Sequence, residues 1–226
     1  SLADGKFYTI FSFLFGLGFA VQMARAESKG TDISTFYPRR LLILFGIGVL
    51  HSFLWWGDIL RTYAMLGFVL LAFRKRSNRT VLIWACIFLV LSLVPSSLPN
   101  VFGGKDSIGG SSSDILGLTE LIWQGPTVMA LFLLGLLVGR VKFFERPPEH
   151  KTLLKWILAF GLLVGLPIQI AVNSVLVLTD GNLFFKLVTL LGTLGLSAAY
   201  ISGLSLLSMQ DKGAKLLKPL SSVGRM

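Results

Sequence analysis

Long apolar runs separated by short polar stretches dominate this sequence. A helix that crosses a membrane needs about 20 mostly apolar residues. Candidate spans lie at residues 7–23, 41–56, 59–73, 80–98, 118–139, 153–178 and 183–209. We therefore expect an all-α fold, a polytopic transmembrane bundle of about seven helices, organised as a single domain over residues 1–226.

The composition points to the lipid bilayer as the main partner. Hydrophobic residues make up 54% of the chain and charged residues only 14%, whereas soluble domains carry roughly 25% charged residues. The mean hydropathy is +0.75. The net charge of +10 does not indicate nucleic-acid binding, because the basic residues fall in short clusters between apolar runs.

These basic clusters predict the topology. The first, third and fifth connections and the tail carry 17 of the 21 Lys and Arg residues, which leaves Lys6, Arg61, Lys105 and Lys186 for the other side. Basic loops stay in the cytoplasm and attract anionic lipids. We therefore expect a cytoplasmic C-terminus. The chain begins with SLADGKF, so we also expect an excerpt of a longer protein with further helices on either side.

Two small features bear on packing. The pentapeptide GLLVG occurs at 135–139 and again at 161–165, and small residues four positions apart let helices approach closely. We expect the two copies to pack against each other. Cys86 lies in an apolar run and is expected to be a small core residue.

The stretch 39–71 carries the polar residues with the clearest functional interpretation. If the second helix begins at Leu41, His51 lies about 15 Å along it, near the middle of the membrane. An ionisable group there is a functional hypothesis by default, and histidine exchanges protons near neutral pH. The structural alternative is a neutral His51 that bonds a carbonyl or a Ser on a neighbouring helix.

Asp58 and Arg61 follow His51 at the outer side of the membrane. They are three residues apart and can pair if a helix begins at this turn. Asp58 can instead cap the third helix. Other polar residues are expected at the same level and would form an outward-facing pocket if the bundle brings them together: Glu120, Gln124, Asn173, Asp180 and Lys186.

Arg39 and Arg40 follow Pro38 at the expected start of the second helix. Two arginines there suit anionic lipid headgroups or a phosphate-bearing cofactor, and ordinary topology determinants are the alternative. The sequence contains no zinc-type His/Cys cluster, Walker loop or nucleophile elbow. We expect no metal site, and an ATP-driven pump or a soluble-type hydrolase is disfavoured.

The segments FYTIFSFLFGLGF and RRLLILFGIGVLHSFLWWGDILRTYAMLGFVLL resemble the YeiB-like family of bacterial inner-membrane proteins, which carry the domain of unknown function 418. The residues that carry the resemblance are Phe15, Gly16, Gly18, Arg39, Arg40, His51, Gly57, Asp58, Ile59, Leu60, Tyr63 and Ala64. That family is similar in turn to transmembrane acyltransferases, which use an intramembrane His and a cytosolic acyl-CoA donor. The resemblance implies a multi-pass protein of the bacterial inner membrane.

The leading hypothesis is transfer of an acyl group from acyl-CoA to an extracytoplasmic small-molecule or glycan acceptor. His51 and Asp58 would be catalytic, with Arg61, Tyr63, Glu120 and Gln124 on the acceptor. Arg39 and Arg40 would face the CoA phosphates. The alternatives are a transporter or lipid-handling protein without catalysis, and a purely structural or partner-binding protein. Self-association into a homo-oligomer is compatible with each of these.

Overall fold

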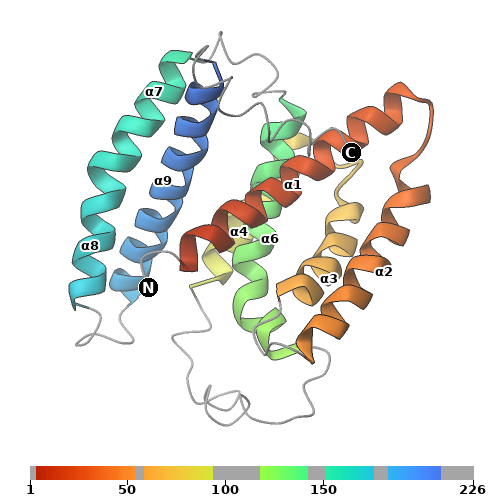
Figure 1. Cartoon of the computed structure of the whole chain (residues 1–226), viewed down its shortest axis with the longest axis horizontal. Coiled ribbons are helices and arrows are strands. Elements are labelled where there is room, and N and C mark those ends of the chain that lie inside the picture. The colour runs from red at the N-terminus through yellow and green to blue at the C-terminus, as the bar shows by residue number, and fades with distance from the viewer. Residues whose placement is uncertain (1–3, 54–58, 94–117, 142–150, 176–182, 210–226) are drawn as a thin grey trace. The chain divides into compact units, whose positions relative to one another are not determined.

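A computed structural model describes residues 4–53, 59–93, 118–141, 151–175 and 183–209 (Figure 1). These residues are helical apart from short turns. The helices are α1 (Asp4–Ser28), α2 (Ile33–Ser52), α3 (Ile59–Ala72), α4 (Asn78–Leu91), α6 (Leu118–Arg140), α7 (Lys151–Phe160), the π-helical turn η2 (Gly161–Gly165), α8 (Leu166–Val175) and α9 (Leu183–Ser208). Since α7, η2 and α8 follow one another without a break, the described residues form seven continuous helices. The predicted all-α fold is confirmed.

The start of α2 differs most from the prediction. The helix begins at Ile33, not at Leu41, and Asp32 caps it by accepting the Ser34 amide at 3.0 Å. Pro38 lies inside the helix, where the sequence predicted a start. The reason is that an apolar run marks where lipid contact begins, whereas a helix begins at its cap.

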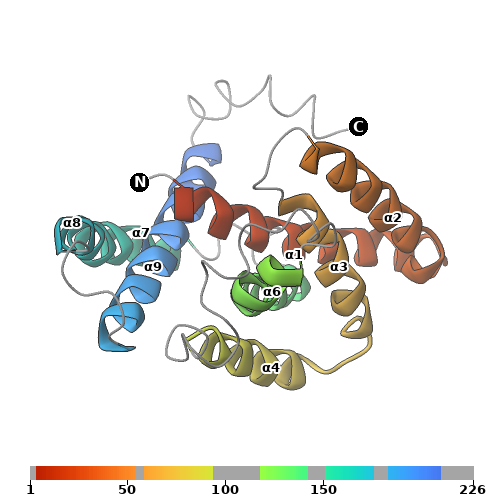
Figure 2. The same cartoon turned by 90° about the horizontal axis from the view of Figure 1, so that it is seen from below.

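The chain divides into two compact units. The N-terminal unit comprises Phe11–Arg140, and the C-terminal unit comprises Val141–Met226 together with Ser1–Ile10. Within the N-terminal unit, α6 lies among α1, α3 and α4, and α2 packs along α3 (Figure 2). The helix α6 is therefore the centre of this unit.

Glycines set the close approach of α1 to α6. A Cβ atom on Gly16 would overlap the Phe132 carbonyl, and one on Gly135 would overlap the Phe13 carbonyl. The two backbones therefore touch. Beside this contact the rings of Phe15 and Phe132 stack with their centroids 4.5 Å apart.

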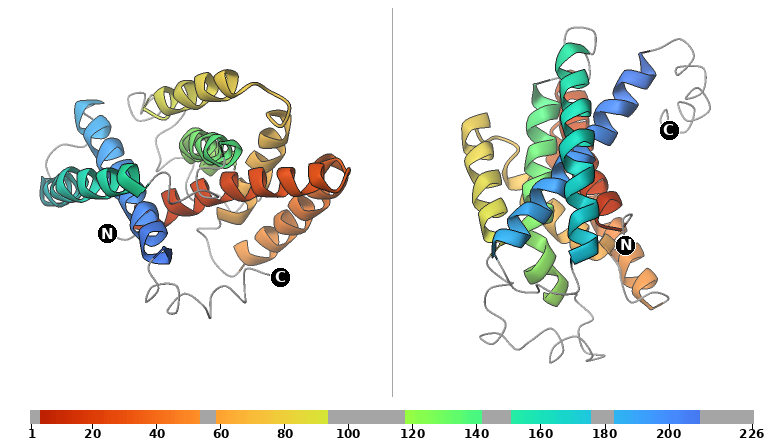
Figure 3. Two further views of the ribbon diagram at one scale, coloured as in Figure 1. Left: turned by 90° about the horizontal axis from the view of Figure 1, so that it is seen from above. Right: turned by 90° about the vertical axis from the view of Figure 1, so that its left-hand side faces the viewer.

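In the C-terminal unit, α7, η2 and α8 form one rod that packs along α9 (Figure 3). Gly161 lies against the Gly195 carbonyl. The π-helical turn ends just before Pro167, whose missing amide disturbs the helical hydrogen bonds at this point. Figure 3 shows residues 151–175 as one continuous helical rod.

Each GLLVG copy has a close helix neighbour within its own unit. Gly135 of the first copy contacts α1, and Gly161 of the second contacts α9. A small-residue pattern allows a close approach but does not specify which helix approaches, and the packing of the two copies against each other stays a prediction.

Large apolar side chains cover the outward helix faces. Phe53 is 79% exposed, Leu163 is 75% exposed and Trp156 is 70% exposed. Such surfaces are unfavourable in water and suit lipid. Three helices are long and apolar enough to cross a membrane, at Phe7–Ser28, Lys151–Ala171 and Leu187–Leu207, and shorter apolar helices lie at Ile59–Ala72, Asn78–Leu91 and Gln124–Arg140. The structure therefore supports a membrane protein.

The sequence predicted that Cys86 is a core residue, and this prediction was wrong. Cys86 lies on one of these outward faces. It is exposed on α4 beside Ile87. The apolar run around it is lipid-facing on this side, so hydrophobicity alone does not separate core positions from lipid-facing ones.

Candidate functional site

Five helix ends meet at one end of the N-terminal unit, which we name the basic end. The Arg74 guanidinium at the end of α3 lies 3.1 Å from Asp32 at the start of α2. Arg140 at the end of α6 donates to the carbonyls of Phe73, Arg74 and Arg76. The described charges at this end are Arg25, Lys29, Arg39, Arg40, Arg74, Lys75, Arg76, Arg79 and Arg140, against Glu27 and Asp32.

The excess of positive charge identifies this end with the predicted cytoplasmic loops. Asp32 is one of the two described carboxylates at this end, and its neighbours stabilise its charged form. The Ser34 amide, the Ser34 hydroxyl and the charges of Arg74 and Lys75 hold the pKa of Asp32 below its usual value.

The predicted site residues gather at the opposite end of the same unit. His51 lies in the last turn of α2, Arg61 and Tyr63 lie in the first turns of α3, and Gln124 lies in the first half of α6. Because α2 runs antiparallel to both α3 and α6, these helix ends share one side. The structure therefore places these four residues toward one end of the unit.

The remaining predicted members of this pocket are not placed. Asp58 and Asp180 lie outside the described residues, as do the side chains of Glu120, Asn173 and Lys186. The pairing of Asp58 with Arg61 and the convergence of the whole set stay predictions.

His51 lies farther along its helix than predicted. It is 18 residues from Ile33, which corresponds to about 27 Å. It is exposed. His51 is therefore not part of the buried core.

Arg61 and Tyr63 are buried between helices. Arg61 is 6% exposed and Tyr63 is 1% exposed. The Tyr63 hydroxyl lies 2.6 Å from the Ser12 hydroxyl of α1. Its ring packs edge-on to Phe132 with the centroids 5.3 Å apart. Tyr63 thus has a packing role in the described structure, whereas the burial of a charged Arg61 in an apolar bundle is typical of functional positions.

Arg39 and Arg40 are exposed in the second turn of α2, not at its start. Arg40 donates to the Gln22 side-chain carbonyl of α1 at 2.6 Å. The two arginines therefore lie toward the basic end of α2.

Two partners of these residues were not predicted from the sequence. Ser12 bonds Tyr63, and Gln22 bonds Arg40. Ser12 and Gln22 each lie between apolar residues in the helix α1. A polar residue in such surroundings is the signal that could have identified them as bonding partners. Their partners are 51 and 18 residues away, so the pairings themselves are tertiary.

Comparison with known proteins bears on the family. A family model described as a protein of unknown function, DUF418, matches residues 138–226. The predicted resemblance to the DUF418 family is thus confirmed over these residues. The DUF418 match covers almost the same residues as the C-terminal unit from Val141 onward, so the candidate site lies in the part of the chain that precedes it.

Two curated relatives match almost the whole chain. The uncharacterized protein YxaH of Bacillus subtilis (strain 168) is 31% identical over 258 aligned positions, which include 98% of this chain and 62% of YxaH. The uncharacterized 39.9 kDa protein in the amylase 3′ region of Bacillus acidopullulyticus is 29% identical over 242 positions, with coverages of 99% and 61%. The chain thus spans about three fifths of the length of these relatives. No solved structure matches it.

Proposed function

We propose that this protein transfers an acyl group from a cytosolic acyl-CoA to an acceptor on the other side of the membrane. The observation that carries the proposal is the position of its polar residues on one helix. In α2, Arg40 lies toward the basic end and His51 lies in the last turn. The separation of 11 residues corresponds to about 16 Å. One helix thus links an anion-binding end with a proton-accepting end.

The chemistry assigned to His51 is general base catalysis. A neutral imidazole nitrogen takes the proton from an acceptor hydroxyl or amine, whose oxygen or nitrogen attacks the thioester carbonyl. The carbon–sulfur bond then breaks, and the CoA thiolate leaves with the proton that the imidazole returns. The pantetheine arm of the donor has to extend along α2 for these groups to meet.

The neighbouring polar residues serve the acceptor in this proposal. In this role Asp58, Arg61, Glu120 and Gln124 orient the acceptor by hydrogen bonds. On the other side, Arg39 and Arg40 bind the phosphates of CoA, for which the planar guanidinium is well suited.

The test of donor binding uses calorimetric titration of acetyl-CoA into the full-length protein in detergent. Saturable binding should weaken at least tenfold in Arg39→Ala/Arg40→Ala. The matched control is Gln22→Ala, which removes the Arg40 contact to α1 but keeps both charges. Equal weakening in the control would assign the effect to helix packing and contradict a phosphate-binding role.

The test of transfer follows radiolabelled acetyl groups from acetyl-CoA into a membrane extract. His51→Gln should leave acetyl-CoA binding unchanged and abolish incorporation of label. Incorporation at the wild-type rate would rule out the assigned role of His51. The exposed neighbour Phe53, changed to Leu, is the control and should remain active.

The alternative function is transport without bond formation. The buried polar residues of α3, Arg61 and Thr62, favour it, because such groups inside an apolar bundle line substrate pathways. Uptake of an unmodified solute by vesicles that carry the full-length protein, together with no label transfer, would favour this alternative.

A further inference from the structure

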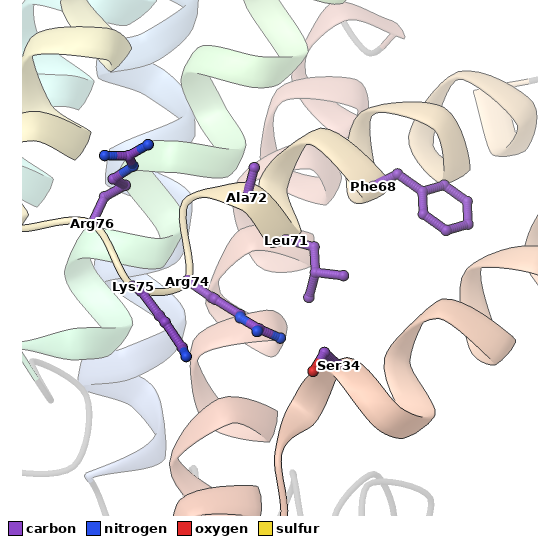
Figure 4. Close-up of a pocket in the computed structure, with 7 residues that line it drawn as sticks. All are labelled: Ser34, Phe68, Leu71, Ala72, Arg74, Lys75 and Arg76. Atoms are coloured by element: carbon purple, nitrogen blue, oxygen red, sulfur yellow. The ribbon is translucent and has the colours of Figure 1, made fainter.

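The basic end holds a hollow that neither the candidate site nor the proposed transfer uses. It has a volume of about 530 Å³ and is lined by Ser34, Phe68, Leu71, Ala72, Arg74, Lys75 and Arg76. Figure 4 shows the Arg74 guanidinium extending toward Ser34 with Lys75 beside it, while the Arg76 side chain points away. The hollow therefore has a cationic rim and an apolar wall.

Contacts from three helices hold this rim in place. Arg140 of α6 bonds the carbonyls of Phe73 and Arg74, and also the Asn78 side chain. Asp32 at the start of α2 holds Arg74. A guanidinium has five donors, so Arg74 can keep Asp32 and bind a second anion. Because these contacts fix the backbone that carries Arg74 and Lys75, little ordering is needed when an anion binds.

A second hollow of about 320 Å³ shares Arg74 and Lys75 but is also lined by Glu27 and Asp32. Its carboxylates repel an anion. None of the described residues that line the first hollow is acidic. A negatively charged ligand therefore belongs in the first hollow.

The wall decides what kind of anion fits. Phe68, Leu71 and Ala72 follow one another along α3 toward the rim, and Phe68 is 39% exposed. A soluble phosphate gains nothing from this apolar wall, whereas the acyl chains of a phospholipid can lie along it. Clusters of basic residues at the cytoplasmic end of membrane helices are also where anionic lipids gather.

We propose that the hollow bounded by Ser34, Leu71, Arg74 and Lys75 binds the phosphodiester headgroup of one anionic phospholipid, whose acyl chains lie along Phe68 of α3. Arg74 and Lys75 neutralise the phosphate. The lining of this site does not include His51, Arg39 or Arg40. The proposal of lipid binding is therefore independent of the proposed acyl transfer.

The experiment is native mass spectrometry of the full-length protein in detergent, titrated with phosphatidylglycerol or with phosphatidylcholine. Phosphatidylglycerol should be retained in preference. In Arg74→Gln/Lys75→Gln its affinity should fall roughly thirtyfold, since each basic group near a membrane surface contributes about a fivefold factor. The control Arg25→Gln/Arg79→Gln removes the same charge from exposed positions outside the lining and should change the affinity less than about threefold.

Three results would overturn the proposal. An equal loss in the control would mean that the charge acts diffusely. Equal retention of phosphatidylcholine would mean that no headgroup is selected. Displacement of the lipid by inorganic phosphate would mean that the hollow is a site for a soluble anion. If the double variant does not fold, Lys75→Gln keeps the Arg74 contact to Asp32 and should still lose about fivefold.

Discussion

The hydroxyl of Tyr63 in α3 lies 2.6 Å from the hydroxyl of Ser12 in α1. Phe11 and Phe15 pack against the same tyrosine ring, with centroids 5.6 and 5.7 Å from it. The contact therefore joins α1 and α3 inside an aromatic cluster. A polar pair in these surroundings holds one specific arrangement of the two helices, because either hydroxyl left alone is unfavourable in an apolar interior.

Removing either member of this pair should destabilise the N-terminal unit. We expect Tyr63→Phe and Ser12→Ala each to lower the free energy of unfolding by about 1 kcal/mol. The double variant should lose less than the sum, because either single substitution already removes the bond between the two hydroxyls. Unfolding in detergent measures the three values. Strict additivity would show that the two hydroxyls do not interact.

The contact between α1 and α6 should not tolerate a methyl group. A Cβ on Gly135 would overlap the Phe13 carbonyl, so Gly135→Ala should destabilise by about 1–3 kcal/mol as the helices move apart. Gly18→Ala is the matched control, since its Cβ would meet nothing within 4 Å. That substitution should be neutral, or stabilising by up to about 1 kcal/mol through helix propensity. Similar unfolding free energies for the two variants would contradict the close backbone contact.

Arg140 should stabilise the turn between α3 and α4. Arg140→Gln removes its charged hydrogen bonds to Phe73, Arg74 and Arg76, and we expect a loss of about 1–2 kcal/mol at this half-exposed position. Amide exchange at residues 73–78 should become faster while exchange in α9 stays unchanged. The control Arg79→Gln removes the same charge from an exposed position and should alter neither exchange rate. Faster amide exchange at residues 73–78 in that variant would assign the effect to net charge.

Asp32 should make the stability of the N-terminal unit depend on pH at the acid end. Its pKa in the folded protein is below the usual value of 3.8, first because the Ser34 amide donates to the carboxylate. A lowered pKa means that the carboxylate stabilises the fold fully above pH 3.8 and loses this effect as the pH falls through the folded pKa.

Unfolding measured at several pH values from 7 to 3 tests this expectation. The stability difference between the wild type and Asp32→Asn should be constant near neutrality and shrink at the acid end. In Arg74→Gln the pH dependence should be reduced but still present, because the bond from the Ser34 amide remains. A difference that is the same at every pH would show that Asp32 titrates normally.

The apolar pattern predicted most helix bounds well, for a physical reason. Residues 118–139 were expected to be helical, and α6 spans Leu118–Arg140; residues 59–73 were expected, and α3 spans Ile59–Ala72. In these segments the polar ends of the run coincide with the helix ends. In α2 they do not, because the helix starts at the Asp32 cap and runs through two turns of mixed polar and apolar residues before the apolar run begins.

The sequence by itself determined the helical class, the need for a lipid environment and the end of the bundle that carries the positive charge, since these follow from local hydrophobicity and the order of charges along the chain. Only the tertiary structure decided which helix each glycine contacts, that Ser12 bonds Tyr63, and that Arg74 and Lys75 face one hollow with Ser34. Those relationships depend on the rotation and pairing of helices distant in sequence, and an apolar run that looks the same on every face does not encode them.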